Sequence, residues 1–298
     1  MKNKRVIRNT IQDRVFYSII YAVLAIISCV ILYPLLFIVS SSLSSAEAIT
    51  SGRVILWPVE PNFESYVAVF QNKSVLMGYK NTLLYTTIGT IIYVMFTMGC
   101  AYPLARRDMP CKNIIMLLFT FTMYFGGGMI PNYLLMMNLN LIDTPAAVIL
   151  PGMINVYNMI VARTFIMGIP NEMLEASQID GCSDIKYFFI ILLPLSKACM
   201  AVLTLYYAVG LWNAYFEPFM YLNNRNMYPL SIFLKEILVA NQMTESMDID
   251  PELLERKQGF SEVIKYSLIV ITTLPILCLY PFVQKYFVKG VMIGSVKG

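Results

Sequence analysis

The sequence predicts an all-α polytopic membrane protein with six transmembrane helices. Of its 298 residues, 58% are hydrophobic and only 13% are charged, and the mean hydropathy is +0.64. One water-facing globule of this length could not bury that much apolar surface. A hydrocarbon core about 30 Å thick needs roughly 20 apolar residues in a helix. Six runs meet this requirement, at about residues 15–43, 83–104, 114–137, 146–169, 198–222 and 263–283.

The first run raises the alternative of a cleaved leader, because cations precede it and Ser28-Cys29 resembles a lipoprotein cleavage site. The run is too long for the apolar core of a signal peptide. Cys29 also continues into VILYPLLFIV rather than into a polar mature chain. We therefore expect a transmembrane span here. Each of the six runs contains Gly, Pro or Asn, which suits helices packed in a bundle.

Positive charges orient the spans, because cytoplasmic loops carry an excess of Lys and Arg. Cations precede the first span, occur in the short connection after the second, and follow the sixth: Lys2, Lys4, Arg5, Arg8, Arg14, Arg106, Arg107, Lys112, Lys285, Lys289 and Lys297. Both termini are therefore predicted to be cytoplasmic. Residues 1–298 are expected to form a single transmembrane domain, with cytoplasmic segments at 1–14, 170–197 and 286–298 and extracellular segments at about 44–80 and 223–262.

Several kinds of chemistry are excluded by composition. The chain has no histidine, which removes His-based metal sites and Ser-His-Asp triads. The phosphate-binding pattern G-x-x-x-x-G-K-[ST] is absent. The six cysteines show no CxxC spacing, so we interpret them as unpaired packing residues. We expect no enzymatic activity, no metal and no cofactor in this chain.

A polar stretch between the fourth and fifth spans, residues 170–197, is called the elbow here. Pro170 and Asn171 are residues that open a helix. Gly181 can adopt the left-handed conformation that ends one. Ser183 can cap a second, amphipathic helix, which we expect to stop at Pro194. The pattern predicts a rigid helix-turn-helix on the cytoplasmic face that docks a partner.

The elbow resembles the signature of binding-protein-dependent ABC importer permeases, which has the form EAA, three residues, Gly, nine residues, Ile-x-Leu-Pro. This chain has Glu175-Ala176-Ser177, then Gly181, then Ile191-Leu192-Leu193-Pro194, with every spacing matched. Serine stands at 177 where alanine is usual. The LWNAYFEPFMYL run at 211–222 and the KGVMIGSVKG ending are similar to the carbohydrate-uptake class, which includes the smaller maltose permease subunit. The MYFGGGMIP stretch is similar to permeases of Gram-positive oligosaccharide importers for aldouronates or pectin fragments.

This resemblance implies a type I ABC importer permease fold in the plasma membrane of a Gram-positive bacterium. Its partners would be a second, homologous permease, two ATPase subunits that carry ATP and Mg, and a lipid-anchored or periplasmic solute-binding protein that delivers sugar. The signature residues would contact the ATPase: Glu175, Ala176, Ser177, Gly181, Ile191, Leu193 and Pro194. A C-terminal tail would reach between the ATPase subunits and includes Gly290, Gly294, Lys297 and Gly298.

Polar residues inside spans are candidates for the substrate pathway, because their burial in lipid is costly. The candidates are Asn155 and Asn158 on the fourth span and Trp212, Asn213, Tyr215 and Glu217 on the fifth. Contacts between helices are the alternative role for them, and membrane-edge anchoring is the alternative for Arg163 and Glu217. Gly126-Gly127-Gly128 would permit close helix approach or an unwound turn. Two alternative functions stay open: an ABC permease for peptides, amino acids or a metal complex, and an ATP-independent secondary transporter.

Overall fold

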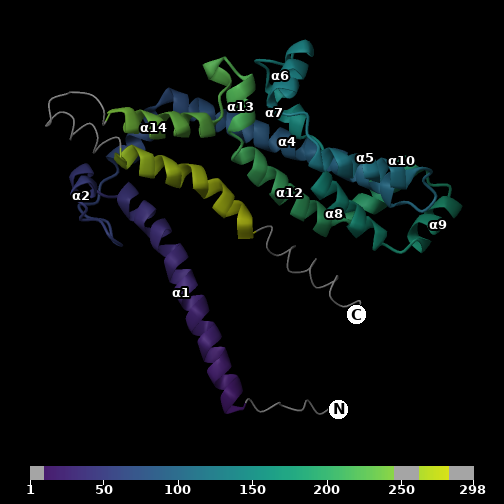
Figure 1. The fold of residues 1–298 in the computed structure, drawn as a ribbon, viewed down its shortest axis with the longest axis horizontal. Helices are drawn as coiled ribbons and strands as arrows, with labels where there is room; N and C mark the ends of the chain where they lie inside the picture. Colours follow the sequence, from purple (N-terminus) through teal and green to yellow (C-terminus); the bar gives the residue numbers. More distant parts are fainter. Residues whose placement is uncertain (1–9, 245–261, 282–298) are drawn as a thin grey trace. The chain divides into compact units, whose positions relative to one another are not determined.

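The computed structural model of the chain describes residues 10–244 and 262–281, and every regular element in these ranges is helical (Figure 1). The described residues belong to two compact units. Unit 1 comprises those of Met1–Gln71 and Ile237–Ile271, and unit 2 comprises those of Asn72–Glu236 and Thr272–Gly298.

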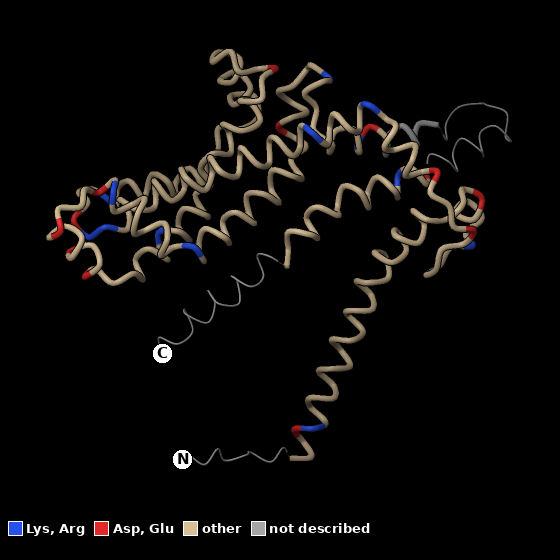
Figure 2. Tube along the Cα trace, turned by 180° about the vertical axis from the view of Figure 1, so that it is seen from behind, with Lys and Arg blue, Asp and Glu red and all other residues tan. Residues whose placement is uncertain are grey.

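Unit 1 is built around the end of α1 (Ile11–Ser42). The only buried residues of α1 are Ser40, Ser41 and Ser42, and its charged residues lie in the first turns, so the long stretch between is apolar and exposed (Figure 2). The Ser42 and Tyr66 hydroxyls lie 2.7 Å apart. Ser267 of the last helix (Glu262–Pro281) donates to the Ser42 carbonyl at 3.2 Å. Hydroxyl groups therefore join the end of α1 to α3 (Glu64–Gln71) and to the last helix.

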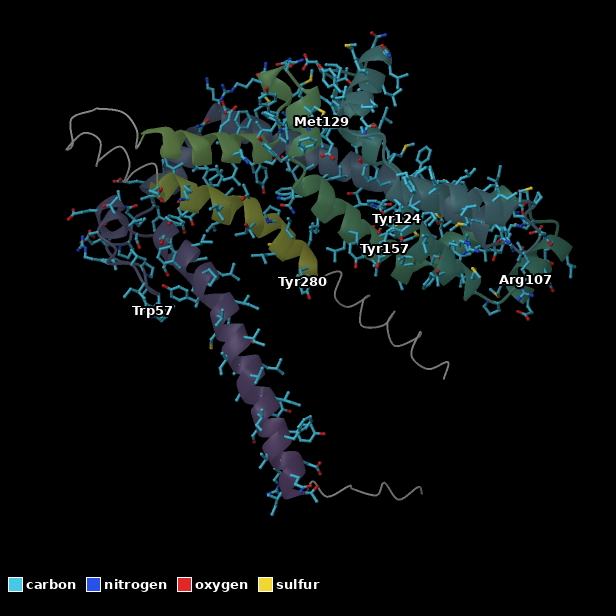
Figure 3. The ribbon with its side chains drawn as sticks, viewed as in Figure 1. Trp57, Arg107, Tyr124, Met129, Tyr157 and Tyr280 are labelled. Atoms are coloured by element: carbon cyan, nitrogen blue, oxygen red, sulfur yellow. The ribbon has the colours of Figure 1, made fainter. Side chains whose placement is uncertain are left out.

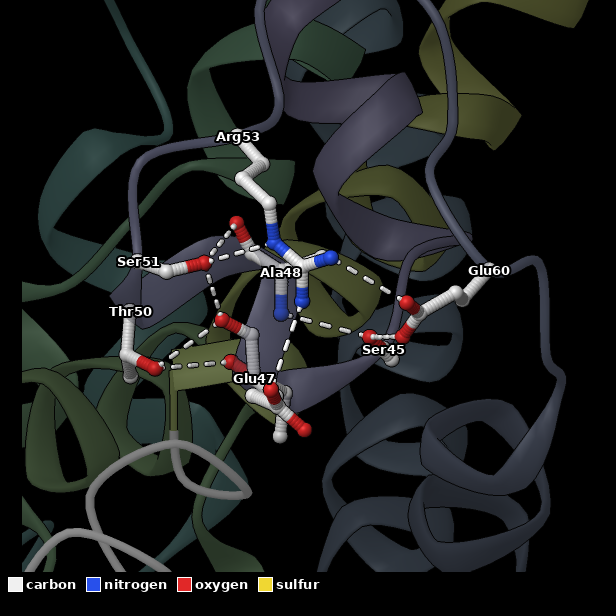
Figure 4. A network of polar contacts seen from close by, with 8 residues as sticks. Ser45, Glu47, Ala48, Thr50, Ser51, Arg53 and Glu60 are labelled. Carbon is white, nitrogen blue, oxygen red and sulfur yellow. Dashed lines mark hydrogen bonds and ion pairs between the residues drawn. The ribbon is translucent and has the colours of Figure 1, made fainter.

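A polar network stabilises the loop after α1 (Figure 4). Ser45 caps α2 (Ala46–Thr50) by accepting from the Ala48 N–H at 3.2 Å, and its hydroxyl donates to Glu60 at 2.7 Å. Arg53 pairs with Glu60 at 3.2 Å and with Glu47 at 3.5 Å. The Ser45 hydrogen bond and the Arg53 charge hold the pKa of Glu60 below its usual value. These exposed contacts set the local path of the loop and add little stability.

Unit 2 is organised by α4 (Lys73–Ala105), which packs against α8 (Val156–Met167) and α12 (Lys197–Trp212). Met98, Met159 and Leu203 are fully buried where the three helices meet. The Thr97 and Tyr207 hydroxyls lie 2.6 Å apart in the same core, so these two buried polar groups are paired with each other.

The described helices fit six spans only if bent pairs are counted as single crossings. Three helices are long and apolar enough alone: Ile11–Ser42, Lys73–Ala105 and Glu262–Pro281. Three further candidates are bent, by 112°, 52° and 82° respectively: Lys112–Tyr124 with Met129–Asn138, Pro145–Gly152 with Val156–Met167, and Asp184–Leu195 with Lys197–Trp212. They contain α5 (Lys112–Tyr124), α6 (Met129–Asn138), α7 (Pro145–Ile149) and η1 (Leu150–Gly152).

Two of the predicted apolar runs differ from the helices that contain them. α4 begins at Lys73, before the run that starts near 83, because Asn72 caps it by accepting from the Ser74 and Val75 N–H groups. The run at 198–222 is not one helix: α12 ends at Trp212, and a separate helix, α13 (Phe216–Tyr221), follows. Pro218 explains the break, because proline is tolerated in the first turn of a helix but not in its interior.

Gly126-Gly127-Gly128, between α5 and α6, forms an unwound turn. This was one of the two predicted roles of the triplet, the other being close helix approach. Tyr124 and Met129 border the triplet (Figure 3). Gly128 has φ +87°, and a Cβ added at Gly126 or Gly128 would meet no atom within 4 Å. The triplet therefore provides backbone freedom rather than close helix approach.

Candidate functional site: the elbow and its supporting loop

The elbow consists of two short helices joined at Gly181. α9 (Glu172–Ile179) precedes the turn and α10 (Asp184–Tyr187) follows it. Gly181 has φ +72°, which confirms the predicted left-handed turn, and a Cβ there would meet nothing within 4 Å. The Ser183 hydroxyl accepts from the Lys186 N–H at 3.4 Å, so the predicted cap of the second helix is also present.

The second helix ends at Leu195, one residue past the predicted stop at Pro194. Between α10 and α11 (Leu193–Leu195) it contains a π-helical segment, η2 (Phe188–Leu192), which the sequence did not predict. A proline ring clashes with the carbonyl four residues earlier in an α-helix, and a wider π turn relieves that clash. The bend falls at Ser196, where the chain turns by 82° into α12.

The signature residues divide between an exposed and a packed group. Glu175 and Ala176 are exposed on α9, and Glu175 forms no ion pair within residues 10–244 and 262–281. Ser177 is buried, and its hydroxyl donates to the Leu174 carbonyl at 2.7 Å. Because this serine bonds within its own helix, it replaces the usual alanine without leaving a buried polar group unpaired.

The second part of the signature anchors the elbow to unit 2. Leu192 is 1% exposed in the core cluster, and Ile191 and Leu193 are half-buried and pack against that cluster. Pro194 is exposed. The end of the elbow is thus held by apolar packing, while α9 and the turn remain accessible.

A loop after α4 supports the start of the elbow. With the Asn171 side-chain amide turned so that its oxygen faces the Arg107 guanidinium, that oxygen accepts from Arg107 Nε at 3.0 Å and from Nη1 at 3.3 Å. The sequence suggested that the Asn171 side chain would cap α9, but it makes no such hydrogen bond. Its backbone is already helical, with φ −64° and ψ −27°. Figure 3 shows Arg107 at the end of unit 2 that carries α9. A charged donor from another segment replaces the local cap.

Arg106 connects the end of α4 to the second helix of the elbow. Its guanidinium pairs with Asp184, the first residue of α10, and with Asp108 at 2.5 Å. Only 16% of the Arg106 side chain is exposed. The hydrogen bond from Arg106 also holds the pKa of the Asp108 carboxyl below its usual value. A planar guanidinium that contacts two carboxylates is a rigid link between two chain segments.

Two further cations stabilise the same corner. Arg163 Nε donates to the Leu104 carbonyl at 2.9 Å, and Lys112 Nζ donates to the Arg106 carbonyl at 3.0 Å. Both satisfy carbonyls at the C-terminal end of α4, where positive charge is favoured. A pocket of about 760 Å³ lies between α9 and the ends of α4 and α8. Both positively and negatively charged side chains line this pocket, and Glu172 and Glu175 are among the acidic ones.

Residues 5–293 match the family described as binding-protein-dependent transport system inner membrane component. The chain belongs to this family. A crystal structure of a bacterial ABC transporter involved in the import of the acidic polysaccharide alginate is similar, with a TM-score of 0.84 and 31% identity over 93% of this chain and 98% of that chain. Protein LplC of Bacillus subtilis is 38% identical over 97% of both chains. The polygalacturonan/rhamnogalacturonan transport system permease protein YtcP of the same organism is 34% identical over 96% of this chain and 100% of its own.

Membership makes this permease a multi-pass component of a transport system that works with a binding protein and an ATPase. Two residues that sequence reasoning missed fit such a partner. Ile179 and Ile185 flank the Gly181 turn and are 87% and 73% exposed. Large apolar side chains at a rigid, protruding turn indicate a protein contact. Both lie within the signature, at positions that its pattern leaves unspecified, and two large apolar side chains beside the polar turn at Gly181 were the signal that could have identified them.

The predicted pathway residues of the permease have local structural partners. Asn155 caps α8 by accepting from the Asn158 N–H at 3.0 Å, and Asn158 is buried. Trp212 Nε1 donates to the Thr272 carbonyl at 2.9 Å. Asn213 donates from Nδ2 to the Val209 carbonyl at 2.9 Å. These bonds use the Asn155 Oδ1, the Trp212 Nε1 and the Asn213 Nδ2, and they leave the Asn213 Oδ1 available as an acceptor.

Tyr215 and Glu217 lie beyond the end of α12. Tyr215 stacks on Phe219, and Glu217 is exposed on α13 without an ion pair in the described part of the chain. The predicted tail residues Gly290, Gly294, Lys297 and Gly298 lie outside the described residues.

Proposed function

We propose that this chain is one of two homologous permease subunits of an ATP-driven ABC importer for oligosaccharides. The relatives support the cargo: YtcP is named for polygalacturonan and rhamnogalacturonan, and AraQ of Bacillus subtilis, 26% identical over 98% of this chain, for arabinooligosaccharides. The chain would form half of the translocation pathway as a single transmembrane domain. ATP would be hydrolysed on the two ATPase subunits, and a solute-binding protein would deliver sugar at the outer face of a Gram-positive plasma membrane.

The elbow carries the coupling part of this proposal. Its turn presents Ile179 and Ile185 for burial in a cleft of the ATPase, and Glu175 lacks an ion-pair partner in the described chain. A basic residue of the ATPase would pair with Glu175 in a partly desolvated contact, where charge pairs contribute more than on an open surface. The tail residues 290–298 would add a second contact to the ATPase.

Movement of the docked ATPase would reach the membrane helices through Arg106 and Arg107. Arg106 connects α4 to Asp184, and Arg107 connects the same loop to Asn171. α4 is also the helix against which α8 and α12 pack. A shift of the elbow is therefore passed to the core of unit 2 as a rigid displacement rather than absorbed in a flexible loop.

Uptake measurements test the cargo. Cells with this gene deleted should lose uptake of one or more labelled oligosaccharides from a panel of neutral and acidic plant-polysaccharide fragments, and the intact gene should restore it. Uptake of di- and tripeptides and of amino acids should be unchanged. Loss of peptide uptake with normal sugar uptake would instead support the non-sugar alternative.

Cysteine labelling tests the orientation. A membrane-impermeant maleimide should label Thr50→Cys in intact cells, because residue 50 is exposed in the segment predicted to be outside. Gln178→Cys on α9 should be labelled only after permeabilisation, and native Cys111, which is also exposed, provides an internal reporter of the same side. Because Cys29 and Cys278 are also exposed, each test position is studied as the only cysteine of the chain. Labelling of Cys111 or of Gln178→Cys in intact cells would then contradict the placement of the elbow in the cytoplasm.

A further inference from the structure

We propose that Lys235, Tyr215 and Phe219 form a binding site for a carboxylate-bearing sugar, so that this permease takes up uronate-containing oligosaccharides. The inference rests on the proposed oligosaccharide import and names its substrate class. The site lies at the end of α4 away from the elbow. There, Asn81 donates to the Asn226 carbonyl at 2.7 Å, and the Leu230 N–H donates to Thr82 Oγ1 at 2.8 Å.

Two aromatic rings provide the apolar surface of the site. The Tyr215 and Phe219 rings are stacked, with centroids 5.4 Å apart and planes 17° apart. Phe219 is 61% exposed, so the stack is open on that side. A stacked ring pair with one open face matches the flat C–H face of a pyranose.

An unpaired ammonium lies beside the rings. Lys235 Nζ is 5.0 Å from the centroid of the Tyr215 ring, is exposed, and has no ion pair in the described chain. The neighbouring Glu236 is already paired with Arg225 at 2.6 Å. The positive charge at Lys235 is therefore available to an anion from outside the chain.

The site is held in place before a ligand arrives. Ser231 lies one turn before Lys235 in α14 (Leu230–Thr244), and its hydroxyl donates to the Ala214 carbonyl at 2.6 Å. This bond attaches α14 to the turn that carries Asn213 and Tyr215. The Asn213 Oδ1 can accept from a sugar hydroxyl, because only its Nδ2 is used, in the bond to Val209. Preorganised groups of this kind lose little entropy on binding.

The remaining acid nearby does not oppose an anion at this site. Glu217 is two residues from Tyr215 and two from Phe219, so it lies about 160–200° around α13 from the ring face. A sugar on the Tyr215–Phe219 stack would thus contact the Lys235 ammonium and not the Glu217 carboxylate. A carboxylate on that sugar would form a charge-assisted hydrogen bond that a neutral sugar lacks.

The choice of an acidic sugar over a neutral one also agrees with the similar proteins. One is a transporter for the acidic polysaccharide alginate, and YtcP is named for polygalacturonan. Because the site supplies one unpaired cation, it should recognise one carboxylate on one sugar unit rather than a whole anionic chain.

Competitive uptake of two sugars by the complete importer tests the assignment. The probes are labelled trigalacturonate and its carboxyl-reduced counterpart, both below saturation. Lys235→Gln should lower trigalacturonate uptake about tenfold and change uptake of the reduced sugar less than twofold. Lys235→Arg should retain most of the uptake of both. Phe219→Ala should lower uptake of both sugars, because it removes stacking rather than charge. Lys73→Gln, a change at another exposed lysine, serves as the matched control and should alter neither.

The outcomes separate this inference from the function on which it rests. Equal loss of both sugars in Lys235→Gln, or no loss of either, would overturn carboxylate recognition while leaving oligosaccharide import intact. If the wild-type importer takes up the reduced sugar but no trigalacturonate, carboxylate recognition is likewise overturned and oligosaccharide import is left intact. A wild-type importer that transports neither probe nor any oligosaccharide of the panel would contradict the proposed function itself.

Discussion

Gly181→Val should leave a permease that inserts into the membrane but no longer retains its ATPase. Gly181 has φ +72°, a backbone conformation that costs a residue with a side chain about 1 kcal/mol or more, and valine is stiffer still. The turn would relax toward negative φ and change the angle between α9 and α10. Ile179 and Ile185 on either side would then no longer present one surface to the ATPase. Glu175→Lys should have a similar effect by placing like charges in contact.

The measurement is co-purification of the ATPase through a tag on the permease, together with ATP hydrolysis stimulated by the loaded binding protein. Gly52→Val is a matched control, because Gly52 also has positive φ (+67°) with nothing within 4 Å of an added Cβ, but lies in the loop after α2. It should carry the same backbone strain and retain the ATPase. Full retention of the ATPase by the Gly181→Val permease would mean that the elbow only connects two helices and does not dock the ATPase.

Arg106→Gln should retain the ATPase but uncouple its hydrolysis from uptake. The substitution removes both ion pairs of Arg106, and with them the link from α10 to the end of α4. Stimulated hydrolysis should continue while oligosaccharide uptake per ATP falls about tenfold, because a coupling contact of a few kcal/mol is lost. Reconstituted proteoliposomes allow both rates to be measured on the same sample.

Double substitution distinguishes the link from a general loss of structure. Asp184→Asn should reproduce the defect, and Arg106→Gln combined with Asp184→Asn should be no worse than either alone, because the two residues act through one contact. Asp108→Asn removes only the exposed, adjacent partner of Arg106 and should change coupling less than twofold. Additive losses in the double variant would assign Arg106 and Asp184 independent roles.

Predictions from local sequence were correct where neighbouring residues decide the structure. The left-handed angle at Gly181 and the Ser183 cap depend on residues within one turn, and both are present. The helical class follows from composition, and the spacing of the elbow signature from 175 to 194 indicated the family. Boundaries were less accurate, since Asn72 starts α4 earlier than hydropathy alone suggests and the chain near Asn213 leaves the helix within an apolar run.

Only the tertiary structure decided which groups the charged and amide side chains contact. In the sequence, three cations served only to orient the spans: Arg106, Arg107 and Lys112. In the structure, Arg106 pairs with Asp184, Arg107 donates to Asn171, and Lys112 donates to a backbone carbonyl. Arg106 and Asp184 are separated by 78 positions along the chain. The ammonium of Lys235 likewise reaches the Tyr215 ring from a different helix. Hydropathy and spacing depend on near neighbours in the chain, whereas ion pairs, ring contacts and exposure depend on which distant segments pack together, and that packing is fixed by the folded core of α4, α8 and α12.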